Sequence, residues 1–460
     1  MDELRKNIKK VFWLYFMLFV LVIGYLLYFV AFQSRYVIGN PFNSRVRMAE
    51  ANIQRGSILD AQHRVLAFSY QTEYGFDREY PFGDMFAHLV GYASFGKMGV
   101  EARYHFELQR LHWEATQRVQ NIFAGHPLQA NRLVLTVDAV LQQLVHEMLG
   151  SQRGAVVVLE PSTGKILAMV SYPAFDPNTI DTHWNTLRTD YENSPLLNRA
   201  TQGLYPPGSI FKMATALAGY HMHYGFTYLC GGAIYYGYER LRCFNAVAHG
   251  MLDITEAFAV SCNTFFAYLG LQLGSQNLRA TADRLLFNRH FTMPLEYVRS
   301  SFPLDEDAAP MEIFHTSIGQ GRTLATPMHM AMLTAAIANG GIMMEPYVVD
   351  SIETPNGRLR QKFLPRRLEQ VMTLEESEFL TDMMVHTVTS GTGLRARIEN
   401  TPVAGKTGTS ENHSGEPHGW FVAFAPAYNP QVAVSVLLEN SGGPARAMDI
   451  ARAAIVHVLE

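Results

Sequence analysis

The feature that most constrains this 460-residue chain is an uncharged apolar stretch near its N-terminus. Residues 11–32 contain no charged side chain and are rich in Leu, Phe, Val and Tyr. At a rise of about 1.5 Å per residue, a helix of this length crosses a hydrocarbon layer of about 30 Å. It is longer than the apolar core of a cleaved signal, and no clear small-residue cleavage site follows it. We therefore predict an uncleaved membrane anchor rather than a buried core helix.

Basic residues flank this stretch on both sides. Four precede it and three follow it, namely Arg5, Lys6, Lys9 and Lys10, then Arg35, Arg45 and Arg47. Under the positive-inside rule this slight asymmetry favours a cytoplasmic N-terminus, and the size of the domain that follows favours the same orientation. The net charge of −4 gives no sign of nucleic-acid binding.

A short motif at residues 205–212 carries the first chemical signal. Pro206, Pro207 and Gly208 end any preceding helix or strand. Residues 211–220, which can form a helix, follow immediately. This places Ser209 in the first turn of a helix, with Lys212 on the same face. A lysine whose pKa is lowered by burial can accept the proton of a serine hydroxyl, and a helix N-terminus offers N–H groups to an oxyanion. The same pattern is also typical of a capping serine beside a solvated lysine.

Two later motifs make the acyl-transfer interpretation specific. One is the Ser-Cys-Asn motif at residues 261–263, inside a segment, 252–269, that we expect to be helical; the other is the Lys-Thr-Gly-Thr motif at residues 406–409. Their order and spacing match the three-motif set of the serine enzymes that bind penicillin. Along nearly its whole length, the chain resembles a class B penicillin-binding protein, a monofunctional peptidoglycan D,D-transpeptidase.

The resemblance implies a role for each residue of the first two motifs. Ser209 is the expected nucleophile, and Lys212 is the base that takes its proton. Ser261 relays a proton to the leaving or incoming amine. Asn263 binds a substrate amide and lies near Lys212. Both Ser261 and Asn263 can face a cleft if the backbone between them is turn-like.

The third motif is expected to hold the substrate. Lys406 either binds the terminal carboxylate of a D-Ala-D-Ala peptide or keeps Lys212 neutral by repulsion. Thr407 and Thr409 donate hydrogen bonds to that carboxylate. Gly408 lets the strand backbone approach the substrate closely. The backbone N–H groups of Ser209 and Thr409 form the expected oxyanion hole.

The predicted fold class is α+β. It comprises a single transmembrane helix, a small, mainly β pedestal, and a transpeptidase domain with a central antiparallel sheet flanked by helices. The expected boundaries are a cytoplasmic tail at 1–10, the anchor at 11–32, a linker and pedestal of the dimerisation type at 33–135, and the transpeptidase domain at 136–460. Strands are expected at 402–409, 419–425 and 431–438, and a closing helix at 444–459.

The start of the pedestal resembles the first pedestal motif of class B enzymes. Arg55 and Asp60 belong to that motif, and we expect them to pair within the pedestal rather than to act in catalysis. His63 occupies the place of the family's turn glycine, although histidine adopts a positive φ less readily than glycine. A polar linker at 39–51 separates this region from the anchor.

The three cysteines and one histidine form a candidate metal site. Cys230, Cys243, His249 and Cys262 are suitable ligands for tetrahedral zinc. Some elongation-type class B enzymes are thought to carry a structural metal in this region, so the resemblance favours zinc bracing the second motif from behind. Two alternatives remain: a Cys230–Cys243 disulfide that leaves Cys262 free, and three buried thiols.

The resemblance also implies where the protein acts and with what. We expect a single-pass protein of the bacterial cytoplasmic membrane, with an extracytoplasmic catalytic domain that crosslinks stem peptides and is covalently inhibited by β-lactams. The expected partner is a membrane glycosyltransferase of the SEDS (shape, elongation, division and sporulation) family. Two alternatives are a D,D-carboxypeptidase or β-lactamase-like relative, which the anchor and pedestal disfavour, and a non-catalytic polymerase activator, which the intact Ser209, Lys212 and Lys406 disfavour.

Overall fold

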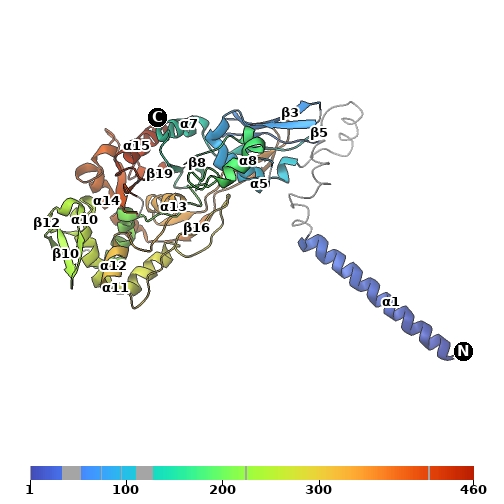
Figure 1. The fold of residues 1–460 in the computed structure, drawn as a ribbon, viewed down its shortest axis with the longest axis horizontal. Coiled ribbons are helices and arrows are strands. Elements are labelled where there is room, and N and C mark those ends of the chain that lie inside the picture. The colour runs from blue at the N-terminus through green and yellow to red at the C-terminus, as the bar shows by residue number, and fades with distance from the viewer. Residues whose placement is uncertain are drawn as a thin grey trace.

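The computed structural model describes residues 2–33, 53–73, 75–94, 96–109, 128–222, 225–412 and 415–460. Together they form an α+β structure in which a long N-terminal helix is followed by a pedestal of strands and a larger body of sheets and helices (Figure 1). The predicted linker at 39–51 lies outside the described residues, as does the part of the predicted pedestal at 110–127.

The N-terminal helix has the properties predicted for a membrane anchor. It comprises α1 (Asp2–Tyr28), extended by a π-helical turn, η1 (Phe29–Gln33). Its apolar part has a mean hydropathy of 2.3, and none of it is buried against the rest of the protein. A helix of this length and composition fits a single pass through a membrane.

The pedestal is built on a six-stranded sheet whose strand order is β15-β14-β6-β2-β3-β4. Its strands are β2 (Ile58–Leu59), β3 (Val65–Thr72), β4 (Gly75–Glu79), β6 (Arg132–Leu135), β14 (Val349–Glu353) and β15 (Leu359–Lys362). All neighbours are antiparallel except β2 and β6. Two of the strands therefore come from far along the chain, which the sequence did not reveal.

Charged side chains buried in the pedestal hold it together. Glu101, in α5 (Gly99–Arg103), is fully buried and accepts hydrogen bonds from Arg55 Nε at 2.6 Å and Arg78 Nε at 2.8 Å. Asp60 is also fully buried and accepts the backbone N–H of Arg64 at 2.7 Å. Arg55 and Asp60 are thus buried and hydrogen-bonded within the pedestal, as expected for structural residues. The carboxylate that pairs with Arg55 is that of Glu101.

His63 makes the turn that follows Asp60. Its φ is 64°, so the turn is left-handed even though the residue is not glycine.

The body contains a five-stranded, fully antiparallel sheet in the order β17-β18-β19-β7-β8. Its strands are β17 (Ala404–Ser410), β18 (His418–Ala425), β19 (Val432–Leu438), β7 (Gly154–Leu159) and β8 (Ile166–Tyr172). The strands are almost wholly buried because helices cover both faces. The predicted C-terminal strands are confirmed to within a few residues.

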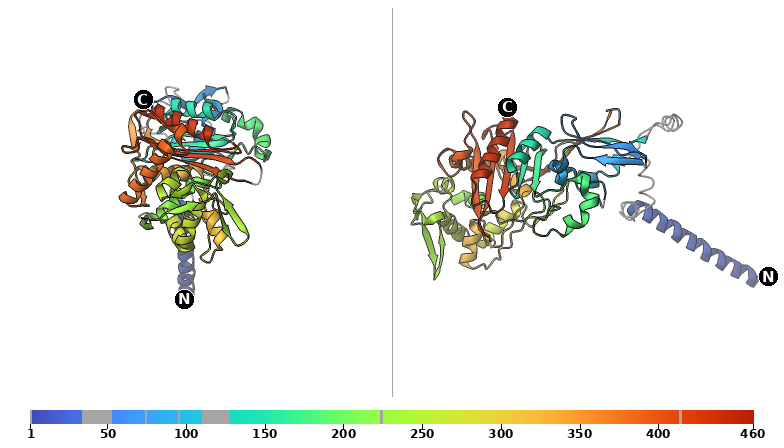
Figure 2. Two further views of the ribbon diagram at one scale, coloured as in Figure 1. Left: turned by 90° about the vertical axis from the view of Figure 1, so that its left-hand side faces the viewer. Right: turned by 45° about the horizontal axis from the view of Figure 1, so that its top comes forward.

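Helices lie on both faces of the central sheet. The C-terminal helix α15 (Ala445–Leu459) and α7 (Ala139–Leu149) pack on one face, and α13 (Pro327–Ala338) packs on the other (Figure 2). Thr326 caps α13 by accepting the N–H of His329 at 3.1 Å, and proline occupies its first turn. The closing helix predicted at 444–459 is confirmed by α15.

A helical lobe lies beside α13 and contains the second motif. Its helices are α9 (Lys212–Ala218), α10 (Ile254–Ala259), α11 (Asn263–Arg284), α12 (Pro310–Ser317) and α14 (Leu374–Ser390). The segment 252–269, which we expected to be helical, is divided between α10 and α11, and the backbone between them is turn-like. The chain breaks at Ser261, whose φ is 56°, and Cys262 caps α11 by accepting the N–H of Phe265 on its sulfur at 3.4 Å.

The remaining elements are short. They are α4 (Ala87–Val90), α8 (Ile180–Thr189) and the paired strands β1 (Ile53–Gln54) with β5 (Leu128–Gln129), β9 (Tyr228–Cys230) with β12 (Gly250–Leu252), β10 (Ala233–Tyr236) with β11 (Glu239–Arg242), and β13 (Ile342–Met344) with β16 (Arg367–Gln370).

Candidate active site

Ser209 lies in a tight turn pressed against the edge of the central sheet. The turn is a 3-10 helix, η5 (Gly208–Phe211), which runs directly into α9 at Lys212. A side chain at Gly208 would place its Cβ 2.4 Å from the carbonyl oxygen of Thr409, so only glycine permits this contact. Gly208 also has a φ of 55°, a conformation that favours glycine. The turn therefore places Ser209, which is half-buried, beside β17.

Lys212 is fully buried at the centre of the site. Its Nζ donates to Asn263 Oδ1 at 2.7 Å and contacts Ser261 twice, at the carbonyl oxygen (2.7 Å) and at Oγ (3.2 Å). Burial lowers the pKa of Lys212 from 10.5 to about 7. A lysine with a pKa near neutral can take up and release a proton at physiological pH, as a general base must.

Lys406 also contacts Ser261. It is fully buried in β17, and its Nζ donates to Ser261 Oγ at 3.0 Å and to the carbonyl oxygen of Thr407 at 3.1 Å. Burial, followed by repulsion from Lys212, holds the pKa of Lys406 well below its usual value. Repulsion between the two lysines disfavours a positive charge on both at once, and burial is the main cause of the lowered pKa of each. The hydroxyl of Ser261 joins the three motifs.

The left-handed backbone at Ser261 explains how neighbouring residues serve two different sites. With φ at 56°, Ser261 directs its hydroxyl to the lysines, while the sulfur of Cys262 lies in the cysteine cluster described below. Asn263 then begins α11 with its amide oxygen on Lys212. A positive φ is costly for a residue with a Cβ, so the surrounding contacts must hold it.

The third motif lies on an edge strand. Among the described strands β17 pairs only with β18, and it also contacts η5. An edge strand can pair with an extended peptide. A Cβ at Gly408 would lie 2.9 Å from both Ile210 Cγ2 and Trp420 Cβ. Glycine is therefore required there by close packing within the protein itself.

The sequence did not reveal Thr392, which follows α14 and contacts the third motif. Its Oγ1 lies 2.6 Å from Thr407 Oγ1, and its N–H donates to the carbonyl oxygen of Ala259 at 3.0 Å. A Cβ at Gly391 would lie 2.2 Å from that same carbonyl oxygen. Thr392 therefore links β17 to the end of α10. In the sequence, only the glycines on either side of Thr392 indicated that the backbone there approaches another segment closely.

Gly319 and Gly321 predict a loop over residues 315–322, and this loop contacts the turn that contains Ser209. The N–H of Gly208 donates to the carbonyl oxygen of Gly319 at 2.8 Å. Gly319 has a φ of 73°, and a Cβ there would lie 2.1 Å from the carbonyl oxygen of Gly208. The first three residues of the predicted loop belong to α12 instead, because that helix continues to Ser317.

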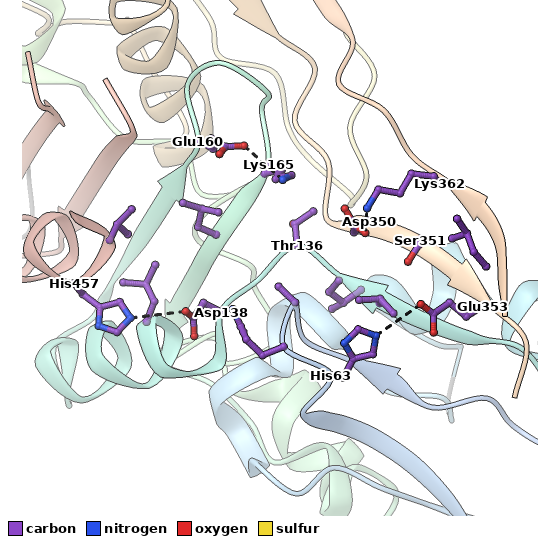
Figure 3. Close-up of a pocket in the computed structure, with 18 residues that line it drawn as sticks. His63, Thr136, Asp138, Glu160, Lys165, Asp350, Ser351, Glu353, Lys362 and His457 are labelled. Atoms are coloured by element: carbon purple, nitrogen blue, oxygen red, sulfur yellow. Dashed lines mark hydrogen bonds and ion pairs between the residues drawn. The ribbon is translucent and has the colours of Figure 1, made fainter. Parts of the chain in front are cut away.

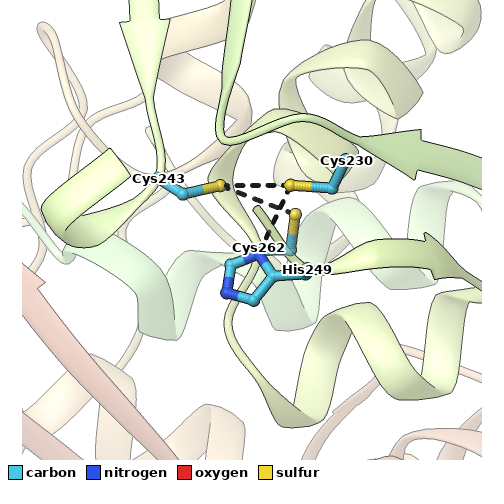
Figure 4. Close-up of side chains that lie close together, drawn as sticks. All are labelled: Cys230, Cys243, His249 and Cys262. Atoms are coloured by element: carbon cyan, nitrogen blue, oxygen red, sulfur yellow. Dashed lines mark hydrogen bonds between the residues drawn. The ribbon is translucent and has the colours of Figure 1, made fainter. Parts of the chain in front are cut away.

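The four predicted metal ligands, which include Cys262 of the second motif, lie close together (Figure 4). Their ligand atoms all lie within 4.8 Å of one another. The Sγ of Cys243 is 3.7 Å from the Sγ atoms of both Cys230 and Cys262, and Cys230 Sγ is 3.4 Å from His249 Nδ1. A disulfide bond measures about 2.05 Å, so these cysteines are unbonded. The cluster can hold a metal ion.

A separate cavity of about 910 Å³ lies at the junction of the pedestal sheet and the central sheet (Figure 3). None of the motif residues lines it. Its charged groups face one another in pairs, with His63 Nε2 3.7 Å from Glu353 Oε1 and His457 Nε2 3.8 Å from Asp138 Oδ2. Because its charged groups pair with one another, we interpret this cavity as a structural feature of the junction between the two sheets.

Comparison with known proteins gives consistent matches along the chain. Residues 154–458 match the penicillin binding protein transpeptidase domain, and residues 55–133 match the penicillin binding protein A dimerisation domain. Peptidoglycan D,D-transpeptidase PbpA of Mycolicibacterium smegmatis is 35% identical over 461 residues, which cover 91% of this chain and 92% of the relative. Peptidoglycan D,D-transpeptidase MrdA of Acinetobacter baumannii is 29% identical over 87% of this chain and 68% of the relative.

Solved structures share the fold. The ceftriaxone acyl-enzyme complex of penicillin-binding protein A from M. tuberculosis matches with a TM-score of 0.83 and 30% identity. The match covers 89% of this chain and 99% of that chain.

Proposed function

The chain belongs to the penicillin-binding protein transpeptidases, and from that premise we propose how its own residues carry out the reaction. The protein is a peptidoglycan D,D-transpeptidase of cell-wall synthesis, a serine enzyme that binds penicillin. The observation that supports the assignment of residues is the position of Ser261 Oγ, 3.2 Å from Lys212 Nζ and 3.0 Å from Lys406 Nζ. The three motifs meet at that hydroxyl.

Acylation begins when the Ser209 hydroxyl attacks the carbonyl carbon between the two terminal D-alanines of a stem peptide. Neutral Lys212 takes the hydroxyl proton, because burial brings its pKa to about 7. Ser261 then passes a proton to the departing D-alanine amine. The products are a Ser209 acyl-enzyme and free D-alanine, and the amine of a second stem peptide attacks that ester to complete the crosslink.

The substrate is held along the free edge of β17. The terminal carboxylate binds Lys406, Thr407 and Thr409, and the peptide amide binds Asn263. The N–H groups of Ser209 and Thr409 stabilise the oxyanion. Removing one such donor typically costs about 3–4 kcal/mol of transition-state stabilisation.

The acylation rate should depend on pH through Lys212. Because its pKa is lowered to about 7, the fraction of neutral Lys212 increases as the pH rises through 7. We expect the second-order rate constant of penicillin acylation to rise about tenfold from pH 6 to pH 8, and then to level off. Stopped-flow measurement with a fluorescent penicillin tests this. A rate that stays constant over that range would exclude Lys212 as the titrating base.

Thr392 should position Thr407 for the substrate carboxylate. We expect Thr392→Val, which removes the 2.6 Å contact, to lower kcat/KM for stem-peptide transfer about fivefold. Thr392→Ser should restore the rate because it keeps the hydroxyl. The matched control is Thr389→Val, at the exposed end of the preceding helix α14, and equal melting temperatures would confirm intact folding. Failure of the serine variant to restore activity would contradict the positioning role.

We place a structural zinc ion in the cysteine cluster. With Zn–S bonds of about 2.3 Å, two sulfurs of a tetrahedral site lie about 3.8 Å apart, close to the observed 3.7 Å. The ligands are Cys230, Cys243, His249 and Cys262. Zinc bound there fixes the backbone at Cys262 and thereby supports Ser261 and Asn263. It takes no part in the chemical steps.

Helix α1 anchors the protein in the bacterial cytoplasmic membrane as a single pass, with the N-terminus inside and the catalytic domain outside. A relative from M. tuberculosis forms acyl-enzyme complexes with β-lactams, and β-lactams acylate Ser209 here. A SEDS-family glycosyltransferase supplies the glycan strands and contacts the anchor and pedestal.

Mass spectrometry of the penicillin adduct tests the assignment of the nucleophile. The expected acylated peptide contains Ser209. A parallel assay with stem-peptide donor and amine acceptor measures transfer against hydrolysis. Predominant transfer is expected, whereas predominant hydrolysis would favour the carboxypeptidase or β-lactamase-like alternative.

A further inference from the structure

A small hairpin next to the active site has no part in the mechanism described above. Strands β10 and β11 form a sheet of their own, paired with no other described strand, and join through Gly237 and Tyr238. The hairpin projects from the end of the molecule opposite the pedestal strands β3 and β5 (Figure 1). Tyr238, at its tip, is fully exposed.

The two faces of the hairpin differ. On one face Ile234 pairs with Leu241, which is buried, and the ring of Tyr236 lies edge-on to Phe314 of α12 at 6.4 Å. This face packs against the helical lobe. The opposite face is directed away from the lobe because side chains alternate along a strand.

The outward face combines an aromatic ring with positive charge. Tyr235 pairs with Arg240 and is 63% exposed, and the next pair on that face contains Arg242. Both arginines are exposed, and neither forms an ion pair with any described residue. Guanidinium groups bind carboxylates through paired hydrogen bonds, and exposed tyrosines supply rigid contact area at binding surfaces. The face therefore suits an acidic ligand, although the chain as a whole carries a net charge of −4.

The base of this face is hydrogen-bonded to Asn263, a residue of the active site. Asn263 Nδ2 donates to the carbonyl oxygen of Arg242 at 3.0 Å, while its Oδ1 accepts from Lys212 at 2.7 Å. A peptide bound at Asn263 and longer than its reacting end can continue onto the face that carries Arg240 and Tyr235.

We propose that the outward face of the β10–β11 hairpin binds the stem peptide of the substrate beyond its reacting D-alanines, through carboxylates paired with Arg240 and Arg242. The proposal rests on the proposed function, since it extends the same site. A peptide suits this face because the face adjoins Asn263, to which the reacting part of the same peptide is proposed to bind. Penicillin lacks the further residues of a stem peptide, so we expect the variants to affect peptide binding without affecting penicillin acylation.

The test compares the two ligands in the full-length enzyme. The variants are Arg240→Glu and Tyr235→Ala, which leave the Arg242 carbonyl and the metal ligands untouched. We expect each to raise KM for a full-length stem peptide about fivefold, with kcat and the rate of penicillin acylation within twofold of wild type. Arg358→Glu and Tyr191→Ala, on exposed sites elsewhere, serve as matched controls.

A second measurement identifies the interacting groups. For a stem peptide whose internal carboxylates are amidated, wild-type KM should rise and that of Arg240→Glu should fall, so that the difference between the two enzymes disappears. The proposal is overturned if KM for the acidic peptide is unchanged in both variants, or if penicillin acylation falls in parallel. Failure of the wild-type enzyme to transfer stem peptides at all would instead overturn the proposed function.

Discussion

Replacing Ser209 with alanine should abolish covalent labelling by fluorescent penicillin and lower transpeptidation by about 10³-fold or more. Ser209 lies in the turn that runs directly into α9 at the buried Lys212, and this turn contacts β17. Without the Ser209 hydroxyl no acyl-enzyme forms, and the remaining groups can only orient a substrate. The measurement is gel fluorescence together with the rate of crosslink formation.

Matched variants make that result specific. Ser151→Ala removes an exposed hydroxyl after α7 and should retain full labelling. Ser261→Ala should slow labelling without preventing it, since Ser261 acts on protons rather than on carbon. Labelling of the Ser209→Ala protein at wild-type level would show that the nucleophile lies elsewhere and would refute the proposed mechanism.

The parts of the molecule that were predictable from sequence depend on local signals. The anchor follows from its length and lack of charge. The C-terminal strands follow from alternation and from the polar turns between them. The three motifs gave the site because each chemical task demands particular residue types.

The parts that were missed depend on contacts between distant segments. Nothing local in residues 349–362 shows that β14 and β15 join the pedestal sheet, because strand pairing is decided by the rest of the fold. Likewise no glycine or proline marks the break at Ser261; contacts with Lys212, Lys406 and the cysteine cluster accompany its positive φ. Thr392 was missed for the same reason, since its partner lies on another element.

Removing the metal should destabilise the protein and slow acylation together. We expect about one zinc per chain after purification without added metal. Cys243→Ser or His249→Ala should lose it and lower the melting temperature by about 5–10 °C, since structural zinc contributes directly to folding free energy. Acylation should slow about tenfold, because Cys262 lies between Ser261 and Asn263 and its displacement shifts both.

The control for this experiment is His183→Ala, an exposed histidine of α8 that should change neither property. Elemental analysis, thermal unfolding and the penicillin acylation rate are measured on the same samples. Protein that contains no zinc and has Cys230 and Cys243 joined by a disulfide would contradict the prediction. Sulfurs 3.7 Å apart must move together to form that bond, whereas a bound zinc ion needs almost the spacing that is already present.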